Sequence, residues 1–264
     1  MKIRQITRHL ESLAPLAFQE DYDNSGLILG DADEDCRGVM ISLDVTEEVL
    51  EEAQQKGCNL LISHHPLIFR GIKQISRETG TGRSIISAIK KGIAVYAIHT
   101  NLDNVLPGVN SAIAGKLGLE NIRFLLPKLV AGAEGTAGSG LIGELREPMD
   151  EKEFLALLQQ QFRIPAIRHT VLTGRPVSRV ALCGGAGSFL ITSALSGNAD
   201  FFITADIRYH EFFGAEGKLV MADIGHYESE QFTIGLIHDA ILKKFTNFAV
   251  LKAGAATNPV HYYL

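Results

Sequence analysis

The chain has 264 residues, a length that allows one or two domains with a sizeable hydrophobic core. Its 46% hydrophobic and 21% charged residues fit a globular protein, and the net charge of −5 disfavours roles in nucleic-acid binding or membrane-surface binding. Three cysteines without a CxxC pair exclude a disulfide scaffold and a cysteine-based zinc site, and they favour a reducing compartment. With no signal-peptide pattern and no long apolar run, the sequence predicts a cytoplasmic protein.

The first half of the chain alternates predicted strands with predicted helices. Apolar residues at helical spacing from Ile3 to Leu13 predict a first helix, which ends at Pro15. Asp44 and Glu47 form the pattern of a capping box, which predicts a helix that begins near Thr46 and ends at Gly57. The other elements expected here are strands at 39–43, 59–63 and 93–98 and helices at 83–91 and after Pro107. This alternation is typical of βαβ units and a largely parallel sheet.

The second half begins with a stretch rich in Gly and Ala, residues 127–140, which we expect to be a linker or crossover. Asp150 is placed to cap a helix at 151–162, and a long helix is expected at about 228–244. The strands expected around these helices lie at 140–145, 166–173 and 178–183, with two further strands before the long helix and a short one at the C-terminus. The predicted fold class is therefore α/β.

Three predicted strands recur in the same order in the two halves. A shift of 141 residues places VMIS (39–42) over VALC (180–183), and NLLIS (59–63) over DFFIT (200–204). A shift of 125 residues places GIAVYA (92–97) over GKLVMA (217–222). Buried strands also resemble one another by composition alone, but the preserved order favours two similarly wound halves.

Histidines and carboxylates gather where the predicted strands end. His64 and His65 follow one strand and Asp103 follows the next, while His226 and Glu230 are four residues apart at a helix start and so share a face. Each of these groups alone is also common on an ordinary protein surface. Together the three imidazoles and two carboxylates are too rich in nitrogen for Ca or Mg, and they suit Zn, Mn, Fe or Co. Five ligands exceed what one catalytic zinc ion needs, so we expect two divalent transition-metal ions.

The remaining polar groups at the strand ends are weaker candidates. His99, Asp206 and His210 are expected to line the pocket or to support the ligands rather than to bind metal. The glycine-rich segment from Cys183 to Ser188 is expected to be a tight turn, with phosphate binding by its amides as the alternative. The basic residues near the expected site are Arg70, Lys73 and Arg208.

Six motifs occur in a fixed order: DNSGL (23–27), SHHP (63–66), HTNLD (99–103), CGGAG (183–187), ADFFITADIRYH (199–210) and GHYESE (225–230). In this set the chain resembles the NIF-three-like family, the GTP cyclohydrolase I type 2 homologues, from near residue 3 to the C-terminus. The resemblance implies a dinuclear metal centre whose ligand positions fall on His64, His65, Asp103, His226 and Glu230, all of which carry the family's residue type.

The resemblance also implies the architecture and the assembly. It implies two similar three-layer α/β/α halves with mainly parallel or mixed sheets, the second inserted into the first, and a toroidal homohexamer built as a trimer of dimers. We therefore expect a metal-site domain at 1–126 plus 225–264 and an inserted domain at 127–224.

The activity that the resemblance implies opens the imidazole ring of the guanine base of GTP by attack of a metal-bound hydroxide at C8. In that scheme Glu230 bridges the ions and His99 or His210 moves protons, which makes these three the catalytic candidates. The leading hypothesis is thus a dinuclear-metal-dependent hydrolase with a nucleotide substrate. Two alternatives stay open: a two-metal phosphoester hydrolase, and a non-catalytic protein that delivers metal or regulates a partner.

Overall fold

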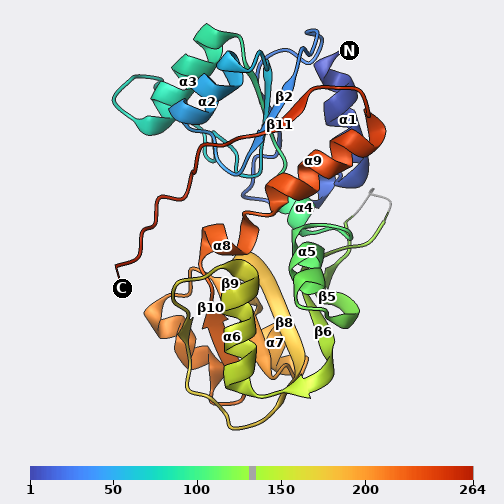
Figure 1. Cartoon of the computed structure of the whole chain (residues 1–264), viewed down its shortest axis with the longest axis vertical. Coiled ribbons are helices and arrows are strands. Elements are labelled where there is room, and N and C mark those ends of the chain that lie inside the picture. The colour runs from blue at the N-terminus through green and yellow to red at the C-terminus, as the bar shows by residue number, and fades with distance from the viewer. Residues whose placement is uncertain (131–134, 264) are drawn as a thin grey trace. The chain divides into compact units, whose positions relative to one another are not determined.

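The computed structural model describes residues 1–130 and 135–263, and the chain forms two compact units. The first unit comprises Met1–Leu102 and Thr233–Pro259, and the second comprises Asp103–Phe232 and Val260–Leu264. Each unit is an α/β structure built around its own sheet, which confirms the predicted fold class (Figure 1). Within the described ranges, no helix has both the length and the apolar character that a bilayer crossing requires.

The two compact units differ from the expected domains in where they divide the chain. Residues 103–126 and 225–232 lie in the second unit, whereas the sequence assigned them to the metal-site domain. The expected domain boundaries, 1–126 plus 225–264 and 127–224, stay a prediction.

A five-stranded sheet forms the centre of the first unit, with the strand order β1–β4–β3–β2–β11. Its parallel strands are β2 (Val39–Ser42), β3 (Leu60–Ser63), β4 (Ala94–Ala97) and β11 (Val250–Lys252). β1 (Gly26–Leu29) runs antiparallel beside β4. β2, β3 and β4 are buried along their whole length, which explains why their sequences are continuously apolar rather than alternating.

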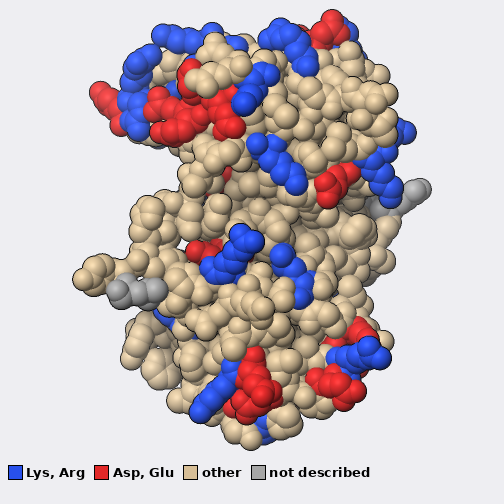
Figure 2. Space-filling model, in the orientation of Figure 1, with Lys and Arg blue, Asp and Glu red and all other residues tan. Residues whose placement is uncertain are grey.

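Helices cover both faces of this sheet. α2 (Glu47–Gln55) and α3 (Gly80–Lys91) pack against the face that carries Met40, Leu61 and Val95. α1 (Ile3–Leu13) and α9 (Thr233–Lys244) lie on the other side, where the Tyr96 hydroxyl donates to Glu11 of α1 at 3.4 Å (Figure 1). Lys and Arg side chains lie beside Asp and Glu over α2 and α3 (Figure 2), as in the pair formed by Arg83 Nε and Glu47 Oε1 at 2.8 Å.

The cap of α2 differs from the predicted one. The Thr46 side chain accepts the cap hydrogen bond from the Val49 amide at 3.3 Å, so the prediction that Asp44 caps this helix was wrong. Thr46 lies directly before the first helical residue, which is the position from which a short side chain reaches that amide. Asp44 instead contacts a histidine of the candidate site, described below.

A six-stranded sheet forms the centre of the second unit, with the order β5–β6–β8–β9–β10–β7. β8 (Val177–Ala186), β9 (Phe201–Ala205) and β10 (Val220–Asp223) are parallel. β5 (Glu120–Lys128), β6 (Ala137–Met149) and β7 (Arg168–His169) pair antiparallel with their neighbours.

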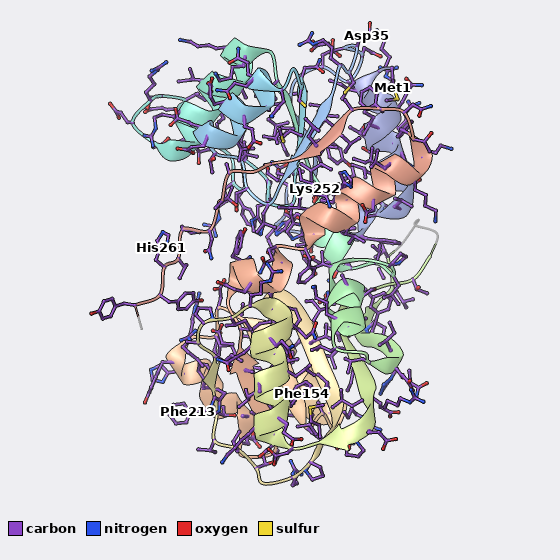
Figure 3. All side chains as sticks on the ribbon, in the orientation of Figure 1. Met1, Asp35, Phe154, Phe213, Lys252 and His261 are labelled. Carbon is purple, nitrogen blue, oxygen red and sulfur yellow. The ribbon has the colours of Figure 1, made fainter. Side chains whose placement is uncertain are left out.

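Helices also cover both faces of the second sheet. α6 (Glu151–Phe162) packs on one face, where the ring of Phe154 (labelled in Figure 3) lies 4.8 Å from that of Phe201. The other face packs against α7 (Ile191–Ser196) and the 3₁₀ helix η3 (Tyr209–Ala215). α5 (Val109–Lys116) and α8 (His226–Glu230) complete the unit, together with η2 (Ser188–Leu190). Asp150 caps α6 as predicted, since its side chain accepts from the amide of Lys152 at 2.8 Å.

The parallel strands of the two sheets show the repeat that the sequence predicts. In the first sheet Val39, Leu60 and Ala94 are register partners, and in the second sheet Val180, Phe201 and Val220 are. The first two strands therefore correspond at the predicted offset of 141 residues. The third corresponds at 126, because Ala94 matches Val220, so the predicted offset of 125 was wrong by one residue.

Three predicted elements differ from the structure. The expected linker at 127–140 includes the paired ends of β5 and β6, where Pro127 and Gly138 are register partners. Residues 131–134 lie outside the described residues. The strand expected at 166–173 is only the two-residue β7. The helix expected at 228–244 is two helices, α8 and α9, because the chain passes from the second unit to the first between Phe232 and Thr233.

Candidate metal centre

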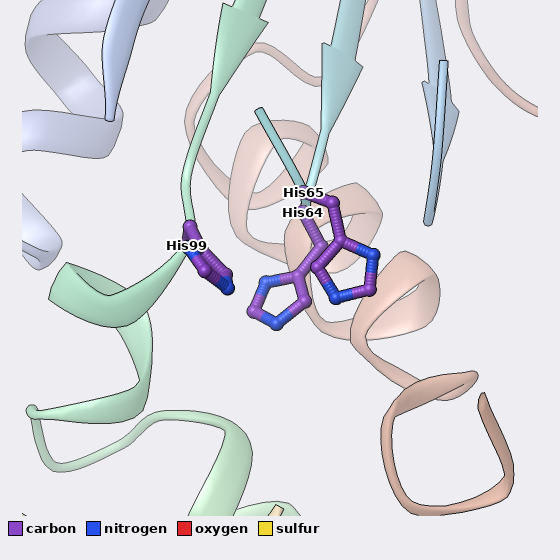
Figure 4. Close-up of side chains that lie close together, drawn as sticks. All are labelled: His64, His65 and His99. Carbon is purple, nitrogen blue, oxygen red and sulfur yellow. The ribbon is translucent and has the colours of Figure 1, made fainter. Parts of the chain in front are cut away.

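Three histidines gather beyond the carboxyl ends of β3 and β4 in the first unit (Figure 4). One ring nitrogen from each of His64, His65 and His99 lies within 4.8 Å of the others. His64 and His65 follow β3 directly, and their ring centroids are 5.0 Å apart, so the strand end brings two adjacent residues to one side. The sequence predicted this convergence for His64 and His65 but placed His99 among the supporting residues.

The orientation of the first two rings is set by acceptors on Nδ1. His64 Nδ1 lies 2.9 Å from the carbonyl oxygen of Ile98, and His65 Nδ1 lies 2.7 Å from Asp44 Oδ1. A carbonyl and a carboxylate only accept hydrogen bonds, so Nδ1 carries the proton in both rings. In its neutral form each ring then presents the lone pair of Nε2, which is how proteins orient histidine to bind a metal ion.

His99 is held in the same way by a buried aspartate. His99 Nδ1 lies 2.8 Å from Asp23 Oδ1, and the side chain of Asp23 is 0% exposed. Asp23 also accepts hydrogen bonds from the amide and the hydroxyl of Thr100. Burial raises the pKa of Asp23. The hydrogen bond and the charge of His99, together with the hydrogen bond of Thr100, outweigh this effect, so the pKa lies well below its usual range. A charged Asp23 thus fixes the tautomer of His99.

The second unit contains a histidine–carboxylate pair on α8. His226 Nε2 lies 3.1 Å from Glu230 Oε2, as the spacing of four residues predicts, and His226 Nδ1 lies 2.7 Å from Asp206 Oδ2. Glu230 is 2% exposed. Burial lowers the pKa of His226, but the hydrogen bonds and charges of Asp206 and Glu230 outweigh it and raise the pKa to about 11. This pair forms an ion pair that a metal ion would replace by binding both groups.

The glycine-rich turn supports Glu230. The amides of Gly184 and Gly185 donate to Asn110 Oδ1 at 2.9 Å and to Ser229 Oγ at 3.0 Å, and the Gly187 amide donates to Thr204 Oγ1 at 2.8 Å. These amides are engaged within the protein, which favours the tight-turn interpretation over phosphate binding. A Cβ on Gly185, whose φ is +62°, would lie 2.4 Å from Glu230 Oε1. Only glycine therefore lets the backbone approach this carboxylate.

Asp103 is tied to the same turn through its backbone. It is the last residue of α4 (Thr100–Asp103), which begins directly after His99. Its carbonyl accepts a hydrogen bond from Asn110 Nδ2 at 3.0 Å, and Asn110 Oδ1 accepts from the Gly184 amide at 2.9 Å. Asn110 thus connects the main chain of Asp103 to the turn that contacts Glu230.

His210 and the basic residues have different surroundings. His210 lies on the exposed η3 and stacks against Phe213 with ring centroids 6.4 Å apart. Arg208 precedes η3, and Arg70 and Lys73 lie on the exposed loop after β3. The catalytic role assigned from the sequence to His210 stays a prediction, as do the metal-ligand roles assigned to His64, His65, Asp103, His226 and Glu230.

Sequence reasoning missed two residues that orient histidines, Asp23 and Asp44. Asp23 belongs to the DNSGL motif before β1, and Asp44 follows the strand that neighbours β3 in the sheet. An acidic residue at the end of a neighbouring strand was the available signal for Asp44, but the capping pattern competed with it. The signal for Asp23 was weaker, because its partner follows β4, more than 70 positions later in the chain.

A family model described as Duf34/NIF3 (NGG1p interacting factor 3) matches residues 1–259. The chain belongs to the Duf34/NIF3 family. This confirms the resemblance stated from the motifs, and curated members of the family are similar along most of their length. A "GTP cyclohydrolase 1 type 2 homolog" of Clostridium perfringens is 35% identical over 87% of both chains, and one of Streptococcus pneumoniae is 33% identical over 99% of this chain and all of the relative.

Among solved structures, the Duf34/NIF3 chain is similar to the Staphylococcus aureus protein SA1388. The TM-score is 0.90 and the identity is 29%, with 100% of this chain and 99% of that chain covered. The whole chain therefore has the same fold as the solved SA1388 structure.

Proposed function

We propose that this protein is a metal-dependent hydrolase that binds transition-metal ions through His64, His65 and His99 in the first unit and through His226 and Glu230 in the second. The observation that carries the proposal is the shared arrangement of the four rings. Each has its Nδ1 fixed by a carboxylate or a carbonyl, as described above. Metal-binding histidines regularly donate Nδ1–H to a carbonyl or a carboxylate in this way, and the acceptors of His64 and His99 are buried.

The donor set fits a transition metal. Four imidazole nitrogens and a buried carboxylate suit Zn, Fe, Mn or Co and are too rich in nitrogen for Ca or Mg. Asp103 remains part of the proposal as a sixth ligand, because Asn110 fixes the backbone that carries it. Two ions, the number expected from the sequence, stay the number to be tested, and Glu230 would be one of the residues that hold them.

Bound ions of this kind supply an activated water at neutral pH and polarise the bond under attack. The protein's own residues prepare the site for that chemistry. Asp44 and Asp23 hold the rings of His65 and His99 in one tautomer, and Asp206 holds the ring of His226 in place, so these rings are oriented before a substrate arrives. The carboxylate of Glu230 is shielded from solvent. Proton transfer stays assigned to His210, because His99 is now proposed as a metal ligand through Nε2 while its Nδ1 contacts Asp23.

The substrate part of the proposal is a purine nucleotide, with ring opening of GTP as the reaction. The names of the curated relatives support it, since they are called GTP cyclohydrolase 1 type 2 homologs. We also propose that the protein acts in the cytoplasm and that it is a hexamer built as a trimer of dimers. Light scattering of the purified protein measures the mass of the assembly and so tests the hexamer.

A screen of the metal-reconstituted full-length protein tests the reaction. GTP, other nucleoside triphosphates and simple phosphoesters are incubated with the wild type and with Glu230→Ala. We expect loss of the guanine absorbance and formate release with GTP, and no turnover by Glu230→Ala. Phosphate release without ring opening would replace the proposal with a phosphoester hydrolase. Turnover unchanged in Glu230→Ala, or no product from any substrate together with metal transfer to an acceptor, would contradict a hydrolase with this site.

A further inference from the structure

Two aromatic side chains are exposed beside the three histidines of the first unit. Tyr22 is 62% exposed and Phe69 is 42% exposed, and their rings are stacked with centroids 6.2 Å apart. They come from segments far apart in the sequence, the turn before β1 and the loop after β3. Large apolar side chains left in water next to a candidate site are typical of a surface that binds a ligand.

The position of this pair relative to the histidines is fixed by the same turn that holds His99. The ring centroid of Phe69 lies 5.7 Å from that of His99, edge to face. Asn24 Nδ2 donates to the carbonyl of Ile68 at 2.7 Å, which ties the Phe69 loop to the turn that carries Asp23. Asp23 in turn holds His99. One short turn, residues 22–24, therefore positions a metal-binding ring and an aromatic pair together.

Positive charge continues from this pair along the same loop. Arg70 follows Phe69 directly and Lys73 lies three residues further, and both are exposed. Flat aromatic faces bind planar rings by stacking, and neighbouring cations bind anionic groups such as phosphate. This combination of aromatic faces and cations suits a single molecule that has both a planar ring and an anionic group.

We propose that Tyr22 and Phe69 form a stacking platform for a planar aromatic ring, and that Arg70 and Lys73 bind the anionic group attached to it. The ligand class is a nucleotide-like molecule, whose ring would be held beside the Nε2 atoms of the histidines. The opening of the bound ring rests on the proposed function, whereas binding of the ring requires no turnover.

A second aromatic cluster offers a competing location within the chain and so a matched control. Tyr209, Phe212 and Phe213 of the second unit line a cavity of about 560 Å³ together with Arg168. Phe213 is 67% exposed, more than Phe69, and it belongs to the second unit, so its removal costs a comparable aromatic surface outside the unit that contains His64, His65 and His99.

Binding of two probes to the full-length protein tests the platform, with Kd measured by calorimetry on metal-free and metal-loaded samples. The probes are guanosine 5′-monophosphate, which has a ring and a phosphate, and ribose 5-phosphate, which lacks the ring. We expect the ring-bearing probe to bind at least about tenfold more tightly. Phe69→Ala and Tyr22→Ala should each weaken it about fivefold or more, in line with the usual contribution of one stacked base. Phe213→Ala should leave its Kd unchanged.

The outcomes separate this inference from the proposed function. Equal Kd values for wild type and Phe69→Ala would overturn the platform, as would weakening by Phe213→Ala alone. A change in oligomeric mass of Phe69→Ala without a change in Kd would show that a second copy of the chain covers the pair. Phe69→Leu, which keeps an apolar side chain, provides the same comparison if the alanine variant fails to fold. Metal content measured on the Phe69 variants tests the metal site independently, because the phenylalanine side chain has no atom that can bind a metal ion.

Discussion

Asp44 connects His65 to the C-terminal part of the first unit. Its Oδ1 lies 2.7 Å from His65 Nδ1, and its Oδ2 accepts a hydrogen bond from the Thr257 hydroxyl at 2.6 Å. Both carboxylate oxygens are therefore used, one to set the tautomer of the ring and one to hold the carboxylate in place. A residue that the capping pattern assigned to a helix start is thus part of the candidate site.

Replacing Asp44 should weaken metal binding with little effect on the fold. Asp44→Ala removes the acceptor that keeps Nε2 of His65 available, and loss of such a partner typically costs about 10–100-fold in metal affinity. Thr46→Ala is the matched control, since it removes the α2 cap two residues away. It should lower the free energy of unfolding by about 1 kcal/mol and leave the metal affinity unchanged. Competition with a chelator measures the affinity, and equal values for Asp44→Ala and wild type would contradict the assigned role.

A methyl group at Gly185 should displace Glu230. Gly185→Ala places a Cβ 2.4 Å from Glu230 Oε1 at a φ of +62°, so both the contact and the backbone conformation are unfavourable. Gly174→Ala is the control, because its φ is +73° and nothing lies within 4 Å of the new Cβ. Both variants should lose about 1 kcal/mol of stability from the backbone, but only Gly185→Ala should lose bound metal. Retention of the full metal content by Gly185→Ala would show that Glu230 is not a ligand.

The pH dependence of the metal-free protein should reflect the ion pair of His226. Its folded pKa of about 11 lies above the ordinary value of 6.5, so the stabilising contribution is fully present below pH 6.5 and is lost as the pH rises toward 11. The difference in melting temperature between wild type and His226→Gln should therefore be largest near pH 6 and shrink by pH 10. Because a metal must displace this proton, metal affinity should rise over the same range. A difference that is constant with pH would contradict the ion pair.

The sheets could be predicted from the sequence because their signals are local. The apolar runs at 39–43, 59–63 and 93–98 became β2, β3 and β4 within one residue, since a buried parallel strand must be apolar at every position. The helix at 228–244 was predicted as one element because helical periodicity continues through Phe232. The break there depends on the chain passing between the two units, which no local pattern encodes.

The candidate site could be predicted only in part. His64 and His65 are adjacent in sequence, and His226 and Glu230 share a helix face, so their convergence follows from short-range geometry. His99 joins the first two through the pairing of β3 with β4, and Asp23 reaches His99 across 76 positions. Such contacts are set by the sheet and not by spacing. The same is true of the contact between Gly185 and Glu230, which makes the expected tight turn also a support for a carboxylate.

Elemental analysis of the purified protein tests the central claim most directly, that both units supply ligands to transition-metal ions. We expect about two transition-metal ions per chain after growth in metal-replete medium. If the ions share the dinuclear centre expected from the sequence, His64→Ala and Glu230→Ala should each lower the content of both, while Gly174→Ala should retain it. A wild-type stoichiometry near zero would contradict the metal site, and loss of one ion in each variant would contradict the shared centre.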